Sequence, residues 1–295
     1  MRPDTGKHRR DRPGDDVVKY SVIVLSFNKL ACTQRCLTRL MEDTECPEPW
    51  ELIVVDNGST DGSAEWCAGE LVGKGNAKGV PVRLIRLPEN IGCSNARNLG
   101  IKTASGEMLA FVDNDVFPCT RRWLPMLNER LAATEGCGMV GPKLLYPPPS
   151  NCIQCAGVGI SRRGHVCFRG RGEPADAPAY NEVREVQCLI SACLMIPHGL
   201  IRKHGGFDPA FHPVQFEDFD LVYRLREQGY RAVYDPAVSM YHDESTTTAG
   251  SAGLNNAANV VRNGLLFQKR WRHLFAEEDG PSEEECRWKK IPRMR

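Results

Sequence analysis

Two carboxylates, Asp113 and Asp115, follow an apolar run at residues 109–112 and are separated only by Asn114. This pattern is typical of a buried strand that carries acidic side chains to a sheet edge. Because side chains alternate between the faces of a strand, both carboxylates point the same way if the strand continues through them. Clustered carboxylates repel unless a cation lies between them, and oxygen ligands suit Mg²⁺ or Mn²⁺ shared with a substrate diphosphate. The alternative is an ordinary Asp-Asn-Asp turn.

The first half of the chain alternates between strand and helix patterns. We expect strands at residues 20–26, 50–55, 82–87 and 109–116, and helices at residues 31–41, from residue 63 and from residue 94. This alternation predicts βαβ units and therefore an α/β fold, a mostly parallel mixed sheet flanked by helices. Ligands of such sheets bind at the carboxyl ends of the strands. Polar residues stand at the ends of the first two strands: Ser26, Asn28, Asp56 and Asn57.

The second half has a looser pattern. We expect strands at residues 138–144, 186–196, 231–235 and 238–242, a hairpin within 151–186 with a mobile loop at 170–178, and helices at 199–204, 217–228 and 255–274. The helix at 217–228 carries Glu217 and Asp218 in its first turn and ends at Gly229. This half therefore adds two further carboxylates to the predicted site.

The composition indicates a globular protein without a global charge field. The 295 residues are 41% hydrophobic and have a formal net charge of +1, so the charge balance does not indicate binding to nucleic acid. No window approaches the roughly 18 apolar residues of a spanning helix, and no signal peptide is recognisable, so we predict a cytoplasmic protein. Residues 1–18 are charged and poor in apolar side chains, so we expect a disordered tail. The 13 cysteines are scattered, which favours free thiols over disulfides.

Several short motifs occur together in one order. They lie at residues 21–28, 54–62, 90–92 with 96–98, 111–115, 205–208 and 216–221. In this combination the chain resembles the family 2 glycosyltransferases, which are inverting enzymes with a nucleotide-diphospho-sugar transferase fold of type A, and within them a rhamnosyltransferase-like branch. The resemblance covers about residues 20–242. It implies one Rossmann-like domain at 19–250, with a nucleotide-sugar-binding half at 19–118 and an acceptor-binding half at 119–250, followed by a C-terminal helix and charged tail at 251–295.

The resemblance also implies roles for residues at the strand ends. Asp56 would bind the uracil or other base, with Ser26, Asn28 and Asn57 beside it, and Asp113 and Asp115 would hold the metal and the sugar diphosphate. Arg97 would pair with donor phosphate or ribose groups, although a guanidinium could equally bridge a surface carboxylate. His242 stands where some relatives place a histidine near the metal, and a neutral imidazole is a suitable third ligand. A surface histidine is the alternative.

Asp218 is the predicted general base. An acceptor hydroxyl must lose its proton as it attacks the anomeric carbon, and one positioned carboxylate suffices for direct displacement with inversion. We expect the neighbouring Glu217 to orient the acceptor or a nearby loop. A helix N-terminus stabilises a carboxylate and weakens it as a base, so the position of Asp218 opposes this role. The alternative is an acidic first turn without chemistry.

Three further features have competing interpretations. Cys152, Cys155, His165 and Cys167 could hold structural zinc, but the spacing of the last two lies outside the usual pattern. Trp123 is favoured as a core residue over an acceptor platform. The basic aromatic stretches at residues 269–273 and 287–290 could contact a membrane surface that carries lipid-linked acceptors, or could be solvated.

The sequence therefore predicts a glycosyltransferase that needs Mg²⁺ or Mn²⁺. It would move a sugar from a nucleotide-diphospho-sugar to an acceptor hydroxyl on a glycan, a lipid-linked sugar or another small molecule, in glycan or cell-surface polysaccharide synthesis, in the cytoplasm or at the inner face of the membrane. Two alternatives are a sugar-phosphate nucleotidyltransferase and a non-catalytic carbohydrate-binding protein of the same fold. The nucleotidyltransferase usually has a Gly-rich basic loop after its first strand, which residues 26–29 lack.

Overall fold

A ten-stranded mixed sheet forms the centre of the molecule, with strand order β10-β12-β6-β11-β4-β1-β2-β3, β5 paired to β12 and β7 paired to β6. This computed structural model describes residues 17–243, 257–289 and 291. The strands of this sheet are β1 (Tyr20–Ser26), β2 (Trp50–Asp56), β3 (Val82–Arg86), β4 (Met108–Asp113), β5 (Val116–Pro118), β6 (Cys137–Leu145), β7 (Ile153–Cys155), β10 (Arg184–Val186), β11 (Cys193–Pro197) and β12 (Arg231–His242). A separate hairpin consists of β8 (Val158–Ile160) and β9 (Val166–Phe168).

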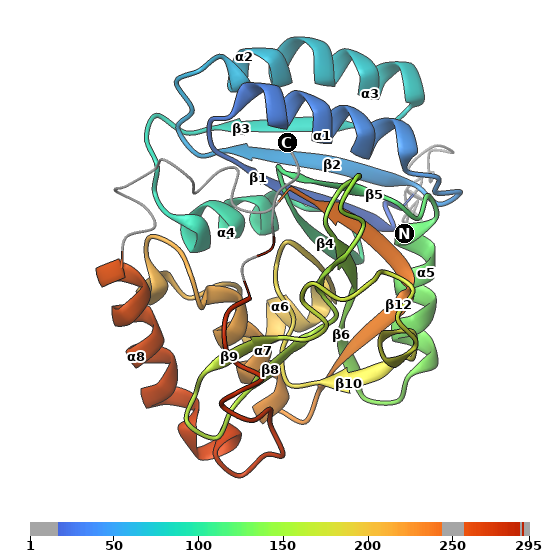
Figure 1. Cartoon of the computed structure of the whole chain (residues 1–295). Coiled ribbons are helices and arrows are strands. Elements are labelled where there is room, and N and C mark those ends of the chain that lie inside the picture. The colour runs from blue at the N-terminus through green and yellow to red at the C-terminus, as the bar shows by residue number, and fades with distance from the viewer. Residues whose placement is uncertain (1–16, 244–256, 290, 292–295) are drawn as a thin grey trace, which may run out of the picture.

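Helices cover both faces of the sheet. They are α1 (Leu30–Asp43), α2 (Ser63–Trp66), α3 (Val72–Lys78), α4 (Cys93–Thr103), α5 (Trp123–Ala133), α6 (His198–His204), α7 (Glu217–Glu227) and α8 (Ala257–Phe275), with a short π-helical segment (Cys67–Leu71) between α2 and α3. Figure 1 shows α1, α2 and α3 on one side of β1, β2 and β3, and α4 on the other side. This arrangement buries both faces of β1 and β2, as the apolar residues at 22–25 and 52–55 predict.

The parallel half of the sheet brings the polar strand ends together. Strands β4, β1, β2 and β3 are parallel neighbours in that order. In this register Ser26 pairs with Asp56, and Leu25 pairs with Asp113. The predicted α/β fold with a mixed sheet is confirmed, and residues from three strands meet at one edge.

The predicted strand at residues 109–116 is wrong at its end. Strand β4 stops at Asp113, residues 114 and 115 form a turn, and β5 begins at Val116. Strand β5 pairs with β12 rather than continuing β4, and His242 lies opposite Val116 in that pairing. Strand alternation therefore does not place the two aspartates side by side. The turn does so, next to the end of β12.

Two other strand boundaries differ from the prediction. The apolar run at residues 186–196 is not one strand, because β10 ends at Val186 and pairs with β12, whereas β11 starts at Cys193 between β4 and β6. The segments at 231–235 and 238–242 form one strand, β12, and a register shift between Asp235 and Ser239 accommodates the proline at position 236.

Most of the remaining elements agree with the sequence patterns, but α5 was not predicted. Helix α7 begins at Glu217, and Gly229 has a positive φ of 88° as expected for the residue after a helix. The predicted helix at 255–274 is observed as α8, and positions 255 and 256 lie outside the described residues, as do positions 1–16 of the predicted tail. The loop predicted to be mobile at 170–178 is hydrogen-bonded, because Ala175 O accepts from Lys143 Nζ and Glu173 O accepts from Ile153 N.

Candidate active site

A cavity of about 470 Å³ lies at the carboxyl ends of β1, β2 and β4. Seven of the ten predicted site residues line it: Asn57, Arg97, Asp113, Asp115, Glu217, Asp218 and His242. The other three, Ser26, Asn28 and Asp56, do not line the cavity. The structure therefore brings the predicted metal ligands and the predicted general base to one space.

Asp113, Asp115 and His242 form a candidate metal site. One potential ligand atom of each lies within 4.8 Å of the others. His242 Nε2 lies 3.3 Å from Asp115 Oδ1, and His242 Nδ1 lies 2.9 Å from the amide oxygen of Gln154. Because an amide oxygen only accepts hydrogen bonds, this contact places the Nδ1 proton towards Gln154 and leaves Nε2 as the ligand atom. His242 is buried, so it is not a surface histidine.

Hydrogen bonds from two other segments hold the turn between β4 and β5 in place. Asn114 Nδ2 donates to Thr33 Oγ1 at 2.8 Å in the interior, and Thr33 lies on α1. Asp243 N, just after β12, donates to Asp115 O at 3.0 Å. Both contacts hold residues 114 and 115 in position. The candidate metal ligands therefore lie on the ends of β4 and β12 and on a turn that hydrogen bonds hold in place.

Arg97 joins two acidic residues of the cavity. Its Nη2 lies 2.7 Å from Asp113 Oδ1 and its Nη1 lies 2.8 Å from Glu217 Oε1. The residue is only 4% exposed, and its guanidinium lies over the ring of Phe207. Burial disfavours the charged form, but the charges of Asp113 and Glu217 outweigh this effect and raise the pKa of Arg97. The alternative of a surface salt bridge is wrong, because this arginine is a buried cation.

Burial dominates the electrostatics of Asp113. It raises the pKa of Asp113, the nearby Asp115 adds to this rise, and Arg97 opposes it. A carboxyl group held this way binds a proton more readily than a solvated one. A divalent cation beside Asp113 and Asp115 would reverse this preference.

Asp218 lies in the first turn of α7 and also faces the cavity. Its Oδ2 accepts a hydrogen bond from Ser191 N at 3.2 Å, and its Oδ1 accepts from Phe219 N at 2.9 Å. Burial and the charge of Glu217 raise the pKa of Asp218 to about 7. We expected the helix N-terminus to weaken this carboxylate as a base. The pKa shift has the opposite direction, because burial and the neighbouring charge outweigh the hydrogen bonds.

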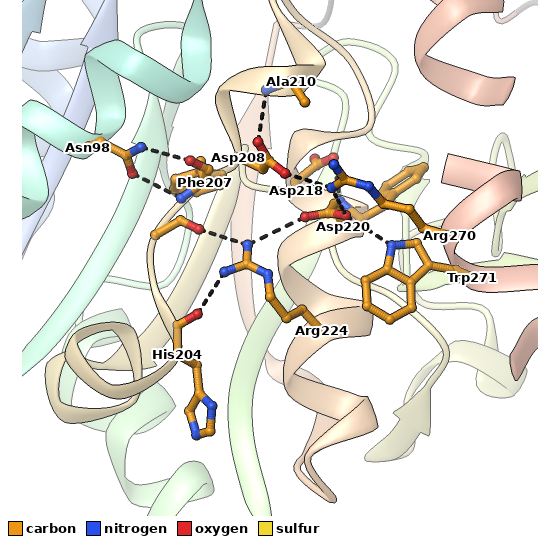
Figure 2. Close-up of polar contacts among 12 residues, drawn as sticks. Asn98, His204, Phe207, Asp208, Ala210, Asp218, Asp220, Arg224, Arg270 and Trp271 are labelled. Carbon is orange, nitrogen blue, oxygen red and sulfur yellow. Dashed lines mark hydrogen bonds and ion pairs between the residues drawn. The ribbon is translucent and has the colours of Figure 1, made fainter. Parts of the chain in front are cut away.

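Helix α7 is held in place by ion pairs and hydrogen bonds, several of them to the buried carboxylate of Asp220 (Figure 2). Asp220 Oδ1 accepts from Arg270 Nη1 at 2.9 Å and from Trp271 Nε1 at 3.0 Å, and both partners lie on α8. Arg224 donates to His204 O and Gly206 O at 2.9 and 2.8 Å. These contacts fix the start of α7, and therefore Asp218, relative to the sheet.

The predicted base-binding residues lie beside the cavity, at the ends of β1 and β2. Asp56 is fully buried, its Oδ1 accepts from Ser59 N at 3.0 Å, and its Oδ2 has no hydrogen-bond partner among the described residues. Ser26 Oγ is likewise without a partner in the described part of the chain. Asn28 Oδ1 accepts from Thr60 N and Asn57 Oδ1 accepts from Ile91 N. Because Asp56 is inaccessible, a base can reach it only if a neighbouring segment moves.

The other interpretations are resolved by burial and by contacts. Trp123 is fully buried and donates to Thr44 Oγ1 at 2.9 Å, so it is a core residue as favoured. The suggested zinc ligands bind elsewhere: Cys155 Sγ donates to Gly157 O, Cys167 Sγ donates to Glu285 O, and His165 pairs with Glu283. Among residues 17–243 and 257–289, the only group of three or more His, Cys, Asp or Glu side chains placed so that it could hold a metal ion is that of Asp113, Asp115 and His242.

Some cavity residues were not predicted from the sequence. Gln154 orients His242, Ser191 binds Asp218, and Phe168 and Trp288 line the cavity from the hairpin and the C-terminal segment. Gln154 lies on β7 and Ser191 in a turn, and no local sequence signal distinguishes either from other polar residues. Trp288 stands in the basic aromatic stretch at 287–290, but its contact with the cavity arises only from the fold.

The fold is that of type-A glycosyltransferases. A crystal structure of GalNAc-T7 with UDP, GalNAc and Mn²⁺ has the same fold, with a TM-score of 0.65 at 14% identity over 88% of this chain and 49% of the other. The family model described as Glycosyl transferase family 2 matches residues 21–143. Residues 21–143 of the chain thus belong to this family of glycosyltransferases.

Two relatives extend the similarity beyond the matched segment. The protein y4gI of Sinorhizobium fredii is 32% identical over 236 residues, which are 77% of this chain and 25% of that protein. The O-antigen biosynthesis protein RfbC of Myxococcus xanthus is 29% identical over 248 residues, which are 79% of this chain and 18% of that protein. The chain thus spans a quarter or less of the length of these two relatives.

Proposed function

We propose that this protein is a metal-dependent, inverting glycosyltransferase that moves a sugar from a nucleotide-diphospho-sugar to an acceptor hydroxyl. The observation that carries the proposal is the shared cavity. The Asp113, Asp115 and His242 group and the carboxylate of Asp218 line the same space of about 470 Å³. This volume suits a small-molecule ligand such as a nucleotide sugar.

The donor set of the candidate metal site suits a hard divalent cation. Two carboxylates and one imidazole, with the imidazole proton directed to Gln154, match the ligands that Mg²⁺ and Mn²⁺ accept. When bound, such a cation would stabilise the negative charge of the departing nucleotide diphosphate. The crystal structure of GalNAc-T7 contains Mn²⁺ with UDP, which supports the same class of cofactor here.

Asp218 would act as the general base. Its carboxylate would take the proton of the acceptor hydroxyl while the hydroxyl oxygen bonds to the anomeric carbon and the bond to the diphosphate oxygen breaks. A pKa of about 7 suits this proton transfer near neutral pH. One carboxylate base in the cavity is sufficient for a single displacement with inversion. Glu217 binds Arg97 and would orient the acceptor side through the start of α7.

Arg97 and the strand-end residues would hold the donor. Arg97 keeps Asp113 in place and puts a buried positive charge beside the space for the diphosphate. The unpaired oxygens of Asp56 and Ser26 are costly when buried, so they fit polar partners on a base or ribose that reach them after a local shift. All three of these donor-side residues come from the first half of the domain, whereas Asp218 comes from the second. This placement supports a donor half at residues 19–118 and an acceptor half at 119–250.

The acceptor would be a glycan or a lipid-linked sugar, in polysaccharide synthesis on the inner face of a membrane. No helix among the described residues is long and apolar enough to cross a bilayer. Much of the basic aromatic stretch on α8 is used inside the fold, since Arg270 and Trp271 bind Asp220. Lys269 and Arg272 are exposed and would supply any peripheral contact with anionic lipid. The rhamnosyltransferase-like branch stays a prediction.

A screen of nucleotide sugars with and without Mn²⁺ tests the proposal. We expect one donor to raise the melting temperature only when Mn²⁺ is present, and to be turned over slowly to free sugar and nucleoside diphosphate without an acceptor. Formation of a nucleotide sugar from a nucleoside triphosphate and a sugar phosphate would instead support the nucleotidyltransferase alternative. Donor binding without any turnover, with every acceptor tried, would support a non-catalytic binding protein.

A further inference from the structure

The C-terminal segment at residues 276–289 lies along the β8–β9 hairpin, which forms one wall of the cavity (Figure 1). Its contacts begin at Glu278, which accepts from Arg226 Nη2 and from Gln187 Nε2, both at 2.7 Å. They end at Lys289, whose backbone oxygen accepts from Arg171 Nε at 3.0 Å. Because Arg226 lies on α7, the segment is tied to the same helix as Asp218.

Two glycines allow this close packing. A Cβ atom at Gly280 would lie 2.1 Å from Ile160 O of β8, and a Cβ at Gly159 would lie 2.8 Å from the ring of Pro281. Both distances are shorter than real Cβ contacts. The segment and the hairpin therefore fit each other only with glycine at these positions, and an alanine at position 280 would lift the segment.

This packing holds Trp288 at the mouth of the cavity. The guanidinium of Arg171 lies 3.7 Å from the centre of the indole ring, and the ring of Phe168 lies 5.5 Å away, edge to face. Trp288 nevertheless remains 58% exposed. A large aromatic side chain that is held in place but left open to solvent is an available surface for a ligand.

A second cavity, of about 530 Å³, lies between the hairpin and the C-terminal segment. It shares Val166, Phe168 and Trp288 with the cavity that contains Asp218. Arg169 and Arg184 also line it, and Arg169 Nη1 donates to Ala156 O at 2.7 Å. Five acidic residues line the same cavity: Glu173, Glu185, Asp279, Glu284 and Glu285. The second cavity therefore offers guanidinium donors, and Phe168 and Trp288 stand between it and the cavity that contains Asp218.

We infer that the second cavity is an acceptor subsite for a glycan chain, and that Trp288 is the platform on which one sugar ring of that chain stacks. The apolar face of a sugar ring packs on an aromatic ring, while its hydroxyl or carboxylate oxygens accept hydrogen bonds from arginine. The terminal sugar of the glycan would reach Asp218, and the following sugar would lie over Arg169 and Arg184. This inference rests on the proposed function and assigns it an acceptor of at least two sugars.

Binding of defined disaccharides tests the subsite. We would measure cellobiose, chitobiose, maltose and digalacturonic acid by saturation-transfer NMR in the presence of UDP and Mn²⁺. At least one disaccharide should bind the wild-type protein. Its affinity for Trp288→Ala should be about tenfold lower, and its affinity for Trp288→Phe should lie within about threefold of the wild-type value. Leu265→Ala is the matched control, because Leu265 is 62% exposed on α8 and lines neither cavity. It should bind as the wild type does.

Two glycine-to-alanine substitutions test whether disaccharide binding depends on the position of Trp288 as well as on its ring. Gly280→Ala should weaken the same disaccharide to a similar extent, because it displaces the segment that carries Trp288. Gly73→Ala should have no effect, since no atom lies within 4 Å of a Cβ at that position.

Nucleotide binding distinguishes failure of this inference from failure of the proposed function. UDP or another nucleoside diphosphate should bind the wild-type protein in the presence of Mn²⁺. If the nucleotide binds but no disaccharide does, or if Trp288→Ala binds the disaccharide unchanged, the subsite assignment is wrong. Loss of binding to anionic phospholipid vesicles by Trp288→Ala, with unchanged disaccharide binding, would likewise contradict it and assign Trp288 to a membrane surface.

Discussion

Arg97 and Glu217 form a buried ion pair at 2.8 Å, although 120 positions separate them in the chain. Both side chains are 5% exposed. Arg97 comes from α4 in the donor-side half of the sheet, and Glu217 begins α7, which carries Asp218. The pair therefore ties the position of the candidate base to the strand ends that surround the candidate metal site.

Glu217→Gln should destabilise the fold by about 3 kcal/mol, because it leaves part of the buried guanidinium charge of Arg97 without compensation. Urea unfolding at pH 7.5 measures the change. Glu42→Gln is the control, since Glu42 pairs with Lys74 on the surface, and it should change stability by less than about 0.5 kcal/mol. Equal effects of the two substitutions would show that the buried pair has no special role.

The pH dependence of transfer should report Asp218. A general base must be deprotonated to act, so kcat/KM should rise with pH and level off, with a midpoint near the pKa of about 7. Asp218→Asn should abolish transfer while donor binding persists. A rate that is independent of pH between about 5.5 and 8.5 would remove Asp218 from the role of titrating base.

The same group predicts a pH-dependent difference in stability. The pKa of Asp218 is raised from an ordinary value of 3.8 to about 7, so the folded protein binds more protons at this site than the unfolded chain between these values. Stability from this group therefore falls as pH rises through that window. The melting temperature of Asp218→Asn should exceed that of the wild type at pH 8, and the difference should shrink at pH 5. A constant difference would contradict the linkage.

Asp56→Asn should weaken donor binding with little effect on the fold. The substitution keeps an oxygen for the hydrogen bond from Ser59 N but replaces a buried acceptor, Oδ2, by a donor. We expect the donor KM to rise about 10- to 100-fold. Asp61→Asn is a suitable control, because Asp61 binds Leu30 N and Ser63 and does not line the cavity. An unchanged donor KM in Asp56→Asn would exclude this residue from base recognition.

Local patterns were sufficient for most of the fold. The strands at 20–26 and 50–55 are rich in β-branched residues, and α7 has an acidic first turn and is followed by Gly229, so each element is encoded by its own residues. The carboxyl ends of parallel strands lie at one edge, which also predicted that Asp56 and Asp113 would be near each other.

Strand boundaries that depend on pairing with distant parts of the chain could not be predicted from local patterns. Strand β4 ends at Asp113 because Val116 pairs with β12, and β12 continues past its proline because a register shift accommodates it. The partners of the site residues depend on the same contacts. Arg97 was predicted as a donor ligand or a surface bridge, but its contact with Glu217 exists only in the folded chain.

Nucleotide binding with and without metal tests the central claim most directly. Titration calorimetry would compare UDP, GDP and dTDP in Mn²⁺ and in EDTA, for the wild type and for Asp115→Ala. We expect one nucleotide to bind the wild type at least about tenfold more tightly with Mn²⁺ than in EDTA, and this gain to be lost in Asp115→Ala. Equal affinity with and without Mn²⁺, or a full Mn²⁺ effect in Asp115→Ala, would contradict a metal-dependent transferase centred on Asp113, Asp115 and His242.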